Sequence, residues 1–251
     1  MAQQALIVGG TTGIGKSTAE LLLQDGLDLI IVGRPNKNLT EAVAELSKLG
    51  SVEGVGLDLS DFREVLQFSK SLPTQYPHLK YLVNAAGYFS PKLFLEHTEE
   101  EYDRYHHFNK AFFFITQAVA EVMKTNGGGS IVNIGSMWAK QAIKATPSSA
   151  YSMAKAGLHS LTQHLAMELA EYHIRVNAVS PAVVVTPIYG AFIEKDKIEE
   201  TLRGFNDFHP IGRVGRPRDI AESIHFLLKD KSAWVTGAIW DIDGGVMAGR
   251  N

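Results

Sequence analysis

The sequence has no cysteine, no long apolar run and almost no excess of charge. Without cysteine the chain has no disulfide, no thiolate nucleophile and no cysteine-ligated zinc or iron–sulfur site, which is compatible with a reducing cytoplasm. No stretch reaches about 18 uninterrupted apolar residues, so we expect no membrane span. The formal net charge of −3 favours neither nucleic acid nor an anionic membrane as a partner. The start, MAQQALIVGG, lacks the basic and apolar regions of a signal peptide, so the predicted location is cytoplasmic.

Nine histidines raise the question of a metal site. None of them stands in a His-Glu-x-x-His or comparable ligand spacing. His106 and His107 are neighbours in a predicted helix, where adjacent side chains point in different directions. We therefore predict no metal centre and interpret this pair as ordinary polar positions.

Short apolar runs, which favour strands, alternate with helical patterns along the 251 residues. Strands are predicted over 5–8, 27–33, 52–59, 80–87, 129–136, 174–181 and 238–245. Helices are predicted over 16–26, 36–49, 61–72, 99–124 and 149–172. This alternation predicts right-handed crossovers and one α/β domain over 1–251, with a doubly wound sheet of about seven parallel strands covered by helices on both faces.

Polar residues or glycines follow six of the predicted strands, at the edge where such sheets bind ligands. They are Gly9, Gly33-Arg34, Asp58, residues 84–87, Ser136 and Ser180-Pro181. Six such strand ends predict an extended cofactor groove. The segment 182–212 is long, weakly periodic and rich in aromatic residues and proline, so we expect a lid or substrate loop there.

The stretch ALIVGGTTGIGKST admits two interpretations. Residues 10–17 match Gly-x-x-x-x-Gly-Lys-Ser, the phosphate loop of ATP- and GTP-binding proteins. Gly9, Gly13 and Gly15 also form a spacing that suits a nicotinamide dinucleotide. Both interpretations require a strand, a tight turn and a helix N-terminus, which together make an anion site. This stretch therefore predicts a phosphate-bearing ligand without identifying it.

The stretch SSAYSMAKAG carries the candidate acid–base chemistry. Tyr151 and Lys155 are four positions apart at the start of a predicted helix, so they share one face. A phenol with a pKa of ~10 is a poor acid or base at neutral pH, and we expect the nearby ammonium to lower that pKa. Ser136, at the end of the preceding strand, is expected to hydrogen-bond a substrate carbonyl oxygen beside Tyr151. Tyr-x-x-x-Lys taken alone also occurs incidentally on helix surfaces.

A set of short motifs runs in order along essentially the whole chain. They are the glycine turn at Gly9, Gly13 and Gly15, LDLS with Asp58, NAAG at 84–87, Asn109, NIGS ending in Ser136, Tyr151 with Lys155, RVNAVSPA at 175–182 and DGG at 243–245. In this ordered set the sequence resembles the short-chain dehydrogenase/reductase family. The resemblance implies a single NAD(P)-binding Rossmann domain and an oxidoreductase that interconverts a carbonyl and a secondary alcohol by hydride transfer.

The resemblance also implies a role for each site residue. Tyr151 gives or takes the proton, and Ser136 orients the substrate oxygen. Lys155 lowers the pKa of Tyr151 and binds the nicotinamide ribose, and Asn109 holds a water of the proton relay. Asp58 and Leu59 contact the adenine ring, while residues 84–87 form the floor under the cofactor. The implied cofactor-binding residues are Gly9, Thr11, Thr12, Gly13, Ile14, Gly15, Arg34, Asp58, Leu59, Asn84, Ala85, Ala86, Gly87, Tyr151, Lys155, Pro181, Val184 and Thr186.

Two departures from the family pattern bear on the site. Ser136 and Tyr151 are 15 positions apart, about two more than is common in the family, so the intervening loop is expected to border the substrate. The run NKAFFFITQ after Asn109 is one residue shorter than usual, which predicts either a helix without its local bulge or a displaced Asn109.

The choice of cofactor depends on the end of the second predicted strand. NAD-specific relatives carry an acidic residue there for the ribose 2′-hydroxyl. This chain has Gly33 followed by Arg34, whose guanidinium suits a 2′-phosphate, so NADP is favoured and NAD stays possible. Tyr88, Phe89, Met137, Trp138 and Ile143 predict a largely apolar pocket for a small carbonyl or alcohol substrate, and core or oligomer contacts are the alternative role for these residues.

Two other functions fit part of the sequence. A phosphate-loop NTPase would leave Ser136, Tyr151 and Lys155 without a role, so we interpret Lys16 and Ser17 as the first turn of a helix. A catalytically silent NADP-binding sensor or structural protein of the same fold is the other alternative. Such a protein would be free to lose Tyr151 or Lys155, and both are present. The resemblance also implies a homo-oligomer, a tetramer or a dimer, formed by the helices that hold Asn109 and Tyr151.

Overall fold

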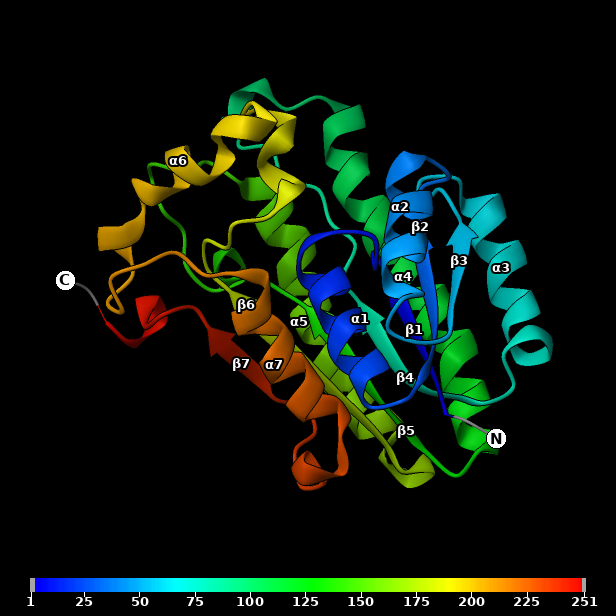
Figure 1. The fold of residues 1–251 in the computed structure, drawn as a ribbon. Coiled ribbons are helices and arrows are strands. Elements are labelled where there is room, and N and C mark those ends of the chain that lie inside the picture. The colour runs from blue at the N-terminus through cyan, green and yellow to red at the C-terminus, as the bar shows by residue number, and fades with distance from the viewer. Residues whose placement is uncertain (1–2, 250–251) are drawn as a thin grey trace.

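Seven parallel strands form the centre of the molecule, because the short apolar runs of the sequence are buried between two layers of helices. The computed structural model describes residues 3–249 (Figure 1). The strands are β1 (Gln4–Val8), β2 (Asp28–Gly33), β3 (Val52–Gly56), β4 (Leu79–Asn84), β5 (Gly129–Ile134), β6 (Ile174–Pro181) and β7 (Ile239–Ile242). Their order is β3-β2-β1-β4-β5-β6-β7, and every neighbouring pair is parallel. The prediction of a doubly wound sheet is confirmed.

Helices cover both faces of the sheet, as the alternating pattern predicts. They are α1 (Gly13–Gln24), α2 (Lys37–Leu46), α3 (Phe62–Gln75), α4 (Glu99–Thr125), α5 (Ser149–Glu168), α6 (Ile198–Arg203) and α7 (Pro217–Leu228). Side chains of α1, α2 and α7 share one apolar cluster with the sheet, and those of α3, α4 and α5 share another. Figure 1 shows α1 and α7 in front of the sheet and α4 and α5 behind it. No helix within residues 3–249 is long and apolar enough to cross a membrane.

The sequence prediction differs from the structure in one helix, in one long loop and at the ends of several elements. Helix α7 has no predicted counterpart, although Pro217 at its first position and the buried Ile220, Ile224 and Leu227 are signals for it. The segment 182–212 is not a plain loop, because it contains α6 and a 3₁₀ turn at Pro187–Ala191. The predicted strands 52–59 and 80–87 end earlier, at Gly56 and Asn84, so the residues that follow are free to form turns at the sheet edge.

The order in which strands are added to the sheet changes direction at β1. After β1 it builds β2 and β3 on one side, then crosses so that β4 pairs with the other side of β1. The carboxyl ends of β1 and β4 therefore flank the switch point, where parallel sheets bind ligands. A cavity of about 780 Å³ lies at this edge.

Candidate active site

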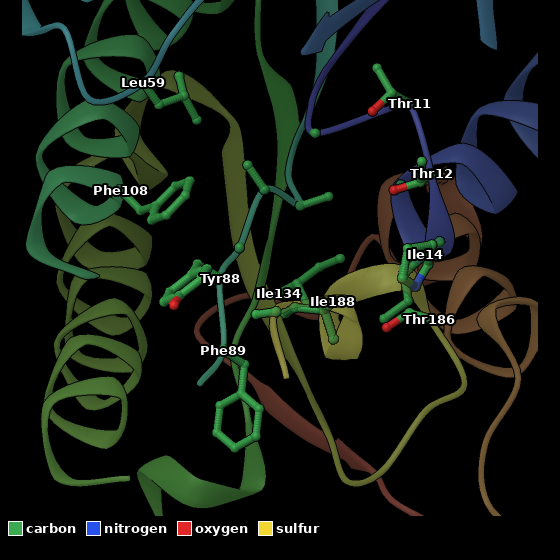
Figure 2. A pocket seen from close by; sticks show the side chains of 18 of the residues that line it. Thr11, Thr12, Ile14, Leu59, Tyr88, Phe89, Phe108, Ile134, Thr186 and Ile188 are labelled. Atoms are coloured by element: carbon green, nitrogen blue, oxygen red, sulfur yellow. The ribbon is translucent and has the colours of Figure 1, made fainter. Parts of the chain in front are cut away.

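The cavity at the switch point is lined by nearly all of the predicted site residues. They are Gly9, Thr11, Thr12, Gly13, Ile14, Gly15, Arg34, Asp58, Leu59, Ala85, Ala86, Gly87, Ser136, Tyr151, Lys155, Pro181, Val184 and Thr186. In Figure 2, Thr11, Thr12, Ile14 and Thr186 lie on one side of it. Leu59, Phe108 and Tyr88 lie on the other side, and Phe89 marks the end away from Leu59.

The glycine turn between β1 and α1 brings bare backbone to the cavity wall. A Cβ on Gly9 would lie 2.4 Å from the backbone nitrogen of Ala86, and a Cβ on Gly15 would lie 2.2 Å from the Gly9 carbonyl oxygen. Thr12 precedes α1 without a capping hydrogen bond from its side chain, so no side chain caps the first N–H groups of this helix there. This turn fits the pyrophosphate of a dinucleotide.

The phosphate-loop interpretation fails in the structure. Lys16 does not line the cavity and instead forms an ion pair with Glu45 of α2. Ser17 is buried against the core. Neither side chain is placed as a phosphate loop requires, so both are part of the first turn of α1, as predicted.

Ser136, Tyr151 and Lys155 meet where β5 ends and α5 begins. Ser136 follows β5 as the N-cap of a 3₁₀ turn, and its Oγ accepts a hydrogen bond from the Trp138 N–H at 3.3 Å. Tyr151 and Lys155 lie in the first turns of α5, with the Lys155 Nζ 5.8 Å from the centre of the Tyr151 ring. The Lys155 Nζ donates to the Ile134 carbonyl at 2.7 Å, which aims the ammonium at the end of β5. The fold therefore brings together a hydroxyl, a phenol and an ammonium.

Burial, rather than the neighbouring charge, controls the two titrations of this cluster. Desolvation raises the pKa of Tyr151 to about 12, although a hydrogen bond from the Ser136 side chain acts in the opposite direction. Desolvation lowers the pKa of Lys155 to about 8. Both groups are withdrawn from water, which disfavours the charged form of each. The lowering of the tyrosine pKa by Lys155 stays a prediction.

His159, one turn after Lys155 on α5, supports Ser136 from behind. Its Nε2 accepts a hydrogen bond from the Ser136 backbone N–H at 3.4 Å, so that nitrogen carries no proton. A Cβ on Gly135 would lie 2.0 Å from the same Nε2, so this glycine leaves room for the imidazole. Burial, with the nearby charges of Lys140 and Lys155, lowers the pKa of His159 to about 4. The imidazole is a neutral, buried support for Ser136.

This buried histidine predicts a loss of stability in acid. Because its pKa falls from 6.5 to about 4 on folding, the unfolded chain binds the extra proton between these pH values. The free energy of unfolding should then decrease as the pH falls from 6.5 to 4, by up to about 3 kcal/mol from this group. Urea unfolding across this pH range measures the slope. A His159→Gln variant keeps an acceptor without titrating and should give a flatter slope; equal slopes would contradict the assignment.

Asn109 faces away from the main cavity. Its Nδ2 donates to the Ala154 carbonyl of α5 at 2.7 Å, and Phe108 lines the main cavity instead. Helix α4 is continuous around it, in accord with the predicted absence of a bulge. Asn109 does line a second cavity of about 20 Å³, which it shares with Tyr151 and Lys155. That volume holds about one water.

Asn84 is the second predicted residue that the structure places elsewhere. It is buried at the end of β4, where its Nδ2 donates to Thr116 Oγ1 at 3.0 Å and to Asn133 Oδ1 at 2.8 Å. The side chain joins β4 to β5 and α4. Its side chain does not line the cavity, whereas Ala85, Ala86 and Gly87 do, and the predicted contact of Asn84 with the cofactor stays a prediction.

Comparisons with known proteins identify the family. A family model described as Enoyl-(Acyl carrier protein) reductase matches residues 8–247. A 3-oxoacyl-[acyl-carrier-protein] reductase of Thermotoga maritima is 35% identical over 245 residues, which cover 96% of each chain. The chain belongs to the short-chain dehydrogenase/reductase family.

Other members of this family match the chain over nearly its whole length. L-xylulose reductase of Bos taurus is 34% identical and the match covers 98% of this chain and 97% of the relative. A solved structure described as an NAD(P)-dependent gluconate 5-dehydrogenase from Beutenbergia cavernae, with NADP bound at low occupancy, is 27% identical. It superimposes with a TM-score of 0.89 and covers 99% of this chain and 98% of its own. The protein is an NAD(P)-dependent oxidoreductase of carbonyl and alcohol groups.

Several residues that line the cavity of this chain are absent from the sequence prediction. They are Asn36, Asn38, Ser60, Arg104, His107, Phe108, Ile188, Tyr189 and Lys195, among others. His107, interpreted from sequence as an ordinary polar position, lies near Asp58. The spacing of Arg104, His107 and Phe108 is a usable signal, because residues three and four apart share a side of a helix.

Proposed function

We propose that this enzyme is an NADPH-preferring reductase of small, largely apolar ketones in which Tyr151 is the proton donor. The observation that carries the proposal is the meeting of Ser136, Tyr151 and Lys155 at one end of a dinucleotide-sized cavity. The nicotinamide, when bound, supplies or accepts the hydride. Membership of the short-chain dehydrogenase/reductase family favours an enzyme over a catalytically silent NADP-binding sensor or structural protein.

Four polar residues have roles in the proposed reaction: Ser136, Tyr151, Lys155 and Asn109. Ser136 donates a hydrogen bond to the substrate oxygen and holds it beside the Tyr151 hydroxyl, which delivers the proton. Lys155 places a positive charge near the developing phenolate and offers its ammonium to the ribose. Asn109 holds a water in the small cavity that it shares with Tyr151 and Lys155. Through that water a proton returns toward the tyrosine.

The preference for NADPH rests on the end of β2. A Cβ on Gly33 would lie 2.4 Å from Thr11 Cγ2, so an acidic side chain at this position would require the Thr11 side chain to move. Arg34 follows and lines the cavity together with Asn36 and Asn38 at the start of α2. No carboxylate at position 33 opposes a 2′-phosphate, and the guanidinium of Arg34 suits it.

An Arg34→Ala variant tests this preference. We expect its KM for NADPH to rise by about 10- to 100-fold, the loss typical of a charge-assisted hydrogen bond, with little change for NADH. Lys37→Ala is the matched control, because Lys37 is exposed and pairs with Glu41. Steady-state kinetics with both cofactors measures the effect. A wild-type enzyme with a much higher kcat/KM for NADH would refute the assignment.

The substrate requires direct measurement, because the relatives' names point to different carbonyl compounds. NADPH consumption over a panel of carbonyl compounds is the test of the proposed reaction. The segment 182–212 is proposed as the substrate lid of one domain that spans 1–251, and the cytoplasmic location stays a prediction. Exposed apolar side chains on α4 and α5, among them Phe113, Met153 and Met167, support a homotetramer or dimer formed by these helices.

A further inference from the structure

Aromatic rings surround the Tyr151 end of the cavity. We call the set of Phe89, Trp138, Tyr151 and Tyr189 the aromatic chamber; all four line the cavity. The centre of the Phe89 ring lies 4.9 Å from that of Tyr151, 6.0 Å from Trp138 and 6.1 Å from Tyr189. The wall beside the reacting hydroxyl is therefore made of aromatic edges and faces.

Phe89 contacts every other ring of the aromatic chamber. It follows β4 in the loop that leads to α4, and its side chain is 6% exposed. The Tyr151 ring comes from α5, Trp138 from the turn after β5, and Tyr189 from the lid, so Phe89 contacts three other parts of the fold. Phe192 of the lid supports it from behind, with ring centres 5.9 Å apart. Figure 2 shows Phe89 at the opposite end of the cavity from Leu59.

The polar groups of the chamber are few. Ser136 and Tyr151 serve the reacting oxygen, and the Lys155 ammonium is bound to the Ile134 carbonyl. Lys140, in the neighbouring loop, pairs with Asp241 at 2.7 Å. The Trp138 Nε1 is buried without a hydrogen-bond partner among the described residues. The Trp138 Nε1 and the Tyr189 hydroxyl can each pair with one substrate hydroxyl, and a polyol would bury its further hydroxyls against aromatic rings without partners, which is costly.

We infer that the substrate is a neutral ketone whose carbonyl is directly attached to an aromatic ring, and that Phe89 selects for that ring. This inference rests on the proposed function. A flat ring makes edge-to-face contacts with Phe89, Trp138 and Tyr189 while its carbonyl reaches Ser136 and Tyr151. A linear ketone of equal size loses more conformational freedom on binding and makes fewer such contacts.

Four carbonyl compounds test the inference on wild type, Phe89→Leu and Phe94→Leu. Acetophenone, 2-octanone and benzoylformate share a carbon count but differ in ring and charge, and xylulose represents polyols. The wild type should give a kcat/KM for acetophenone about tenfold or more above that for 2-octanone. Phe89→Leu should reduce this ratio to about threefold or less, and the ratio rather than either rate is the readout because Phe89 also contacts Tyr151. Phe94→Leu is the matched control, because Phe94 lies in the same loop and is 76% exposed.

The possible results distinguish failure of this inference from failure of the proposed function. Turnover of 2-octanone or xylulose at or above that of acetophenone overturns the inference and leaves the reductase intact. Better turnover of benzoylformate than of acetophenone overturns the neutral charge of the inferred substrate. If no carbonyl consumes NADPH, the proposed function fails. Acetophenone binding by tryptophan quenching, weakened about tenfold in Phe89→Leu, then tests the chamber alone.

Discussion

Replacing Tyr151 with phenylalanine should lower kcat for carbonyl reduction by about 10³-fold, within the range typical of a lost general acid. The change removes only the hydroxyl. The ring contacts of Tyr151 with Phe89 at 4.9 Å and with Tyr105 at 5.8 Å can be made equally well by a phenylalanine ring. The fold and the cofactor cavity should therefore persist, and the loss should appear in the chemical step.

The measurement pairs kcat with NADPH binding followed by fluorescence. We expect the Kd for NADPH to change by only a few-fold, because the Tyr151 hydroxyl is one of many implied contacts with the cofactor and the others are unchanged. Tyr76→Phe is the control, since Tyr76 is also buried and its hydroxyl donates to Glu53 at 2.6 Å, outside the cavity. A Tyr151→Phe enzyme that reduces carbonyls as fast as wild type would show that another group supplies the proton.

The fold could be predicted from sequence where local pattern and burial agree. The run Ala5 to Val8 is fully buried, and such continuous apolar runs mark the strands of a parallel sheet. The lid could not be predicted in this way. Helix α6 has only six residues, and its Ile198 and Leu202 are buried with Met137, Trp138 and Val246, which are distant in sequence. Tertiary packing, rather than a repeating local pattern, holds this segment.

In the site, the conformation of the backbone turn could be predicted from the sequence, and the partners of two side chains could not. The glycine turn was predictable, because the positive φ of Gly9 and its approach to Ala86 demand glycine. The hydrogen-bond partners of Asn84 and Asn109 could not be predicted. A side-chain amide at a strand end or on a helix can bind a ligand or join two elements of the fold equally well. One position along α4 turns a side chain by about 100°, and this decides that Phe108 rather than Asn109 lines the main cavity. Burial sets the titrations of Tyr151 and Lys155, and burial is a property of the assembled layers.

Removing the ammonium of Lys155 should cause the second large loss of activity. We expect a Lys155→Met variant to have a kcat about 10²- to 10³-fold lower than the wild type. The ammonium contacts a carbonyl oxygen, and no ion pair joins it to a carboxylate within residues 3–249. Its positive charge is thus available to the phenolate that develops as Tyr151 releases its proton. A preorganised charge in a site withdrawn from water stabilises such an anion strongly, because little solvent screens it.

The pH profile separates this electrostatic role from simple packing. Because the pKa of Lys155 is lowered to about 8, the ammonium is present below that pH and lost above it. The kcat/KM for reduction should therefore fall above about pH 8, and Lys155→Met should lack this decline while being slow at every pH. Lys80→Met is the control, since the Lys80 Nζ also donates to a carbonyl, that of Gly128 at 3.0 Å, outside the cavity. A Lys155→Met enzyme that keeps both the wild-type rate and the decline would assign the titration to another group and leave Tyr151 to act without the ammonium.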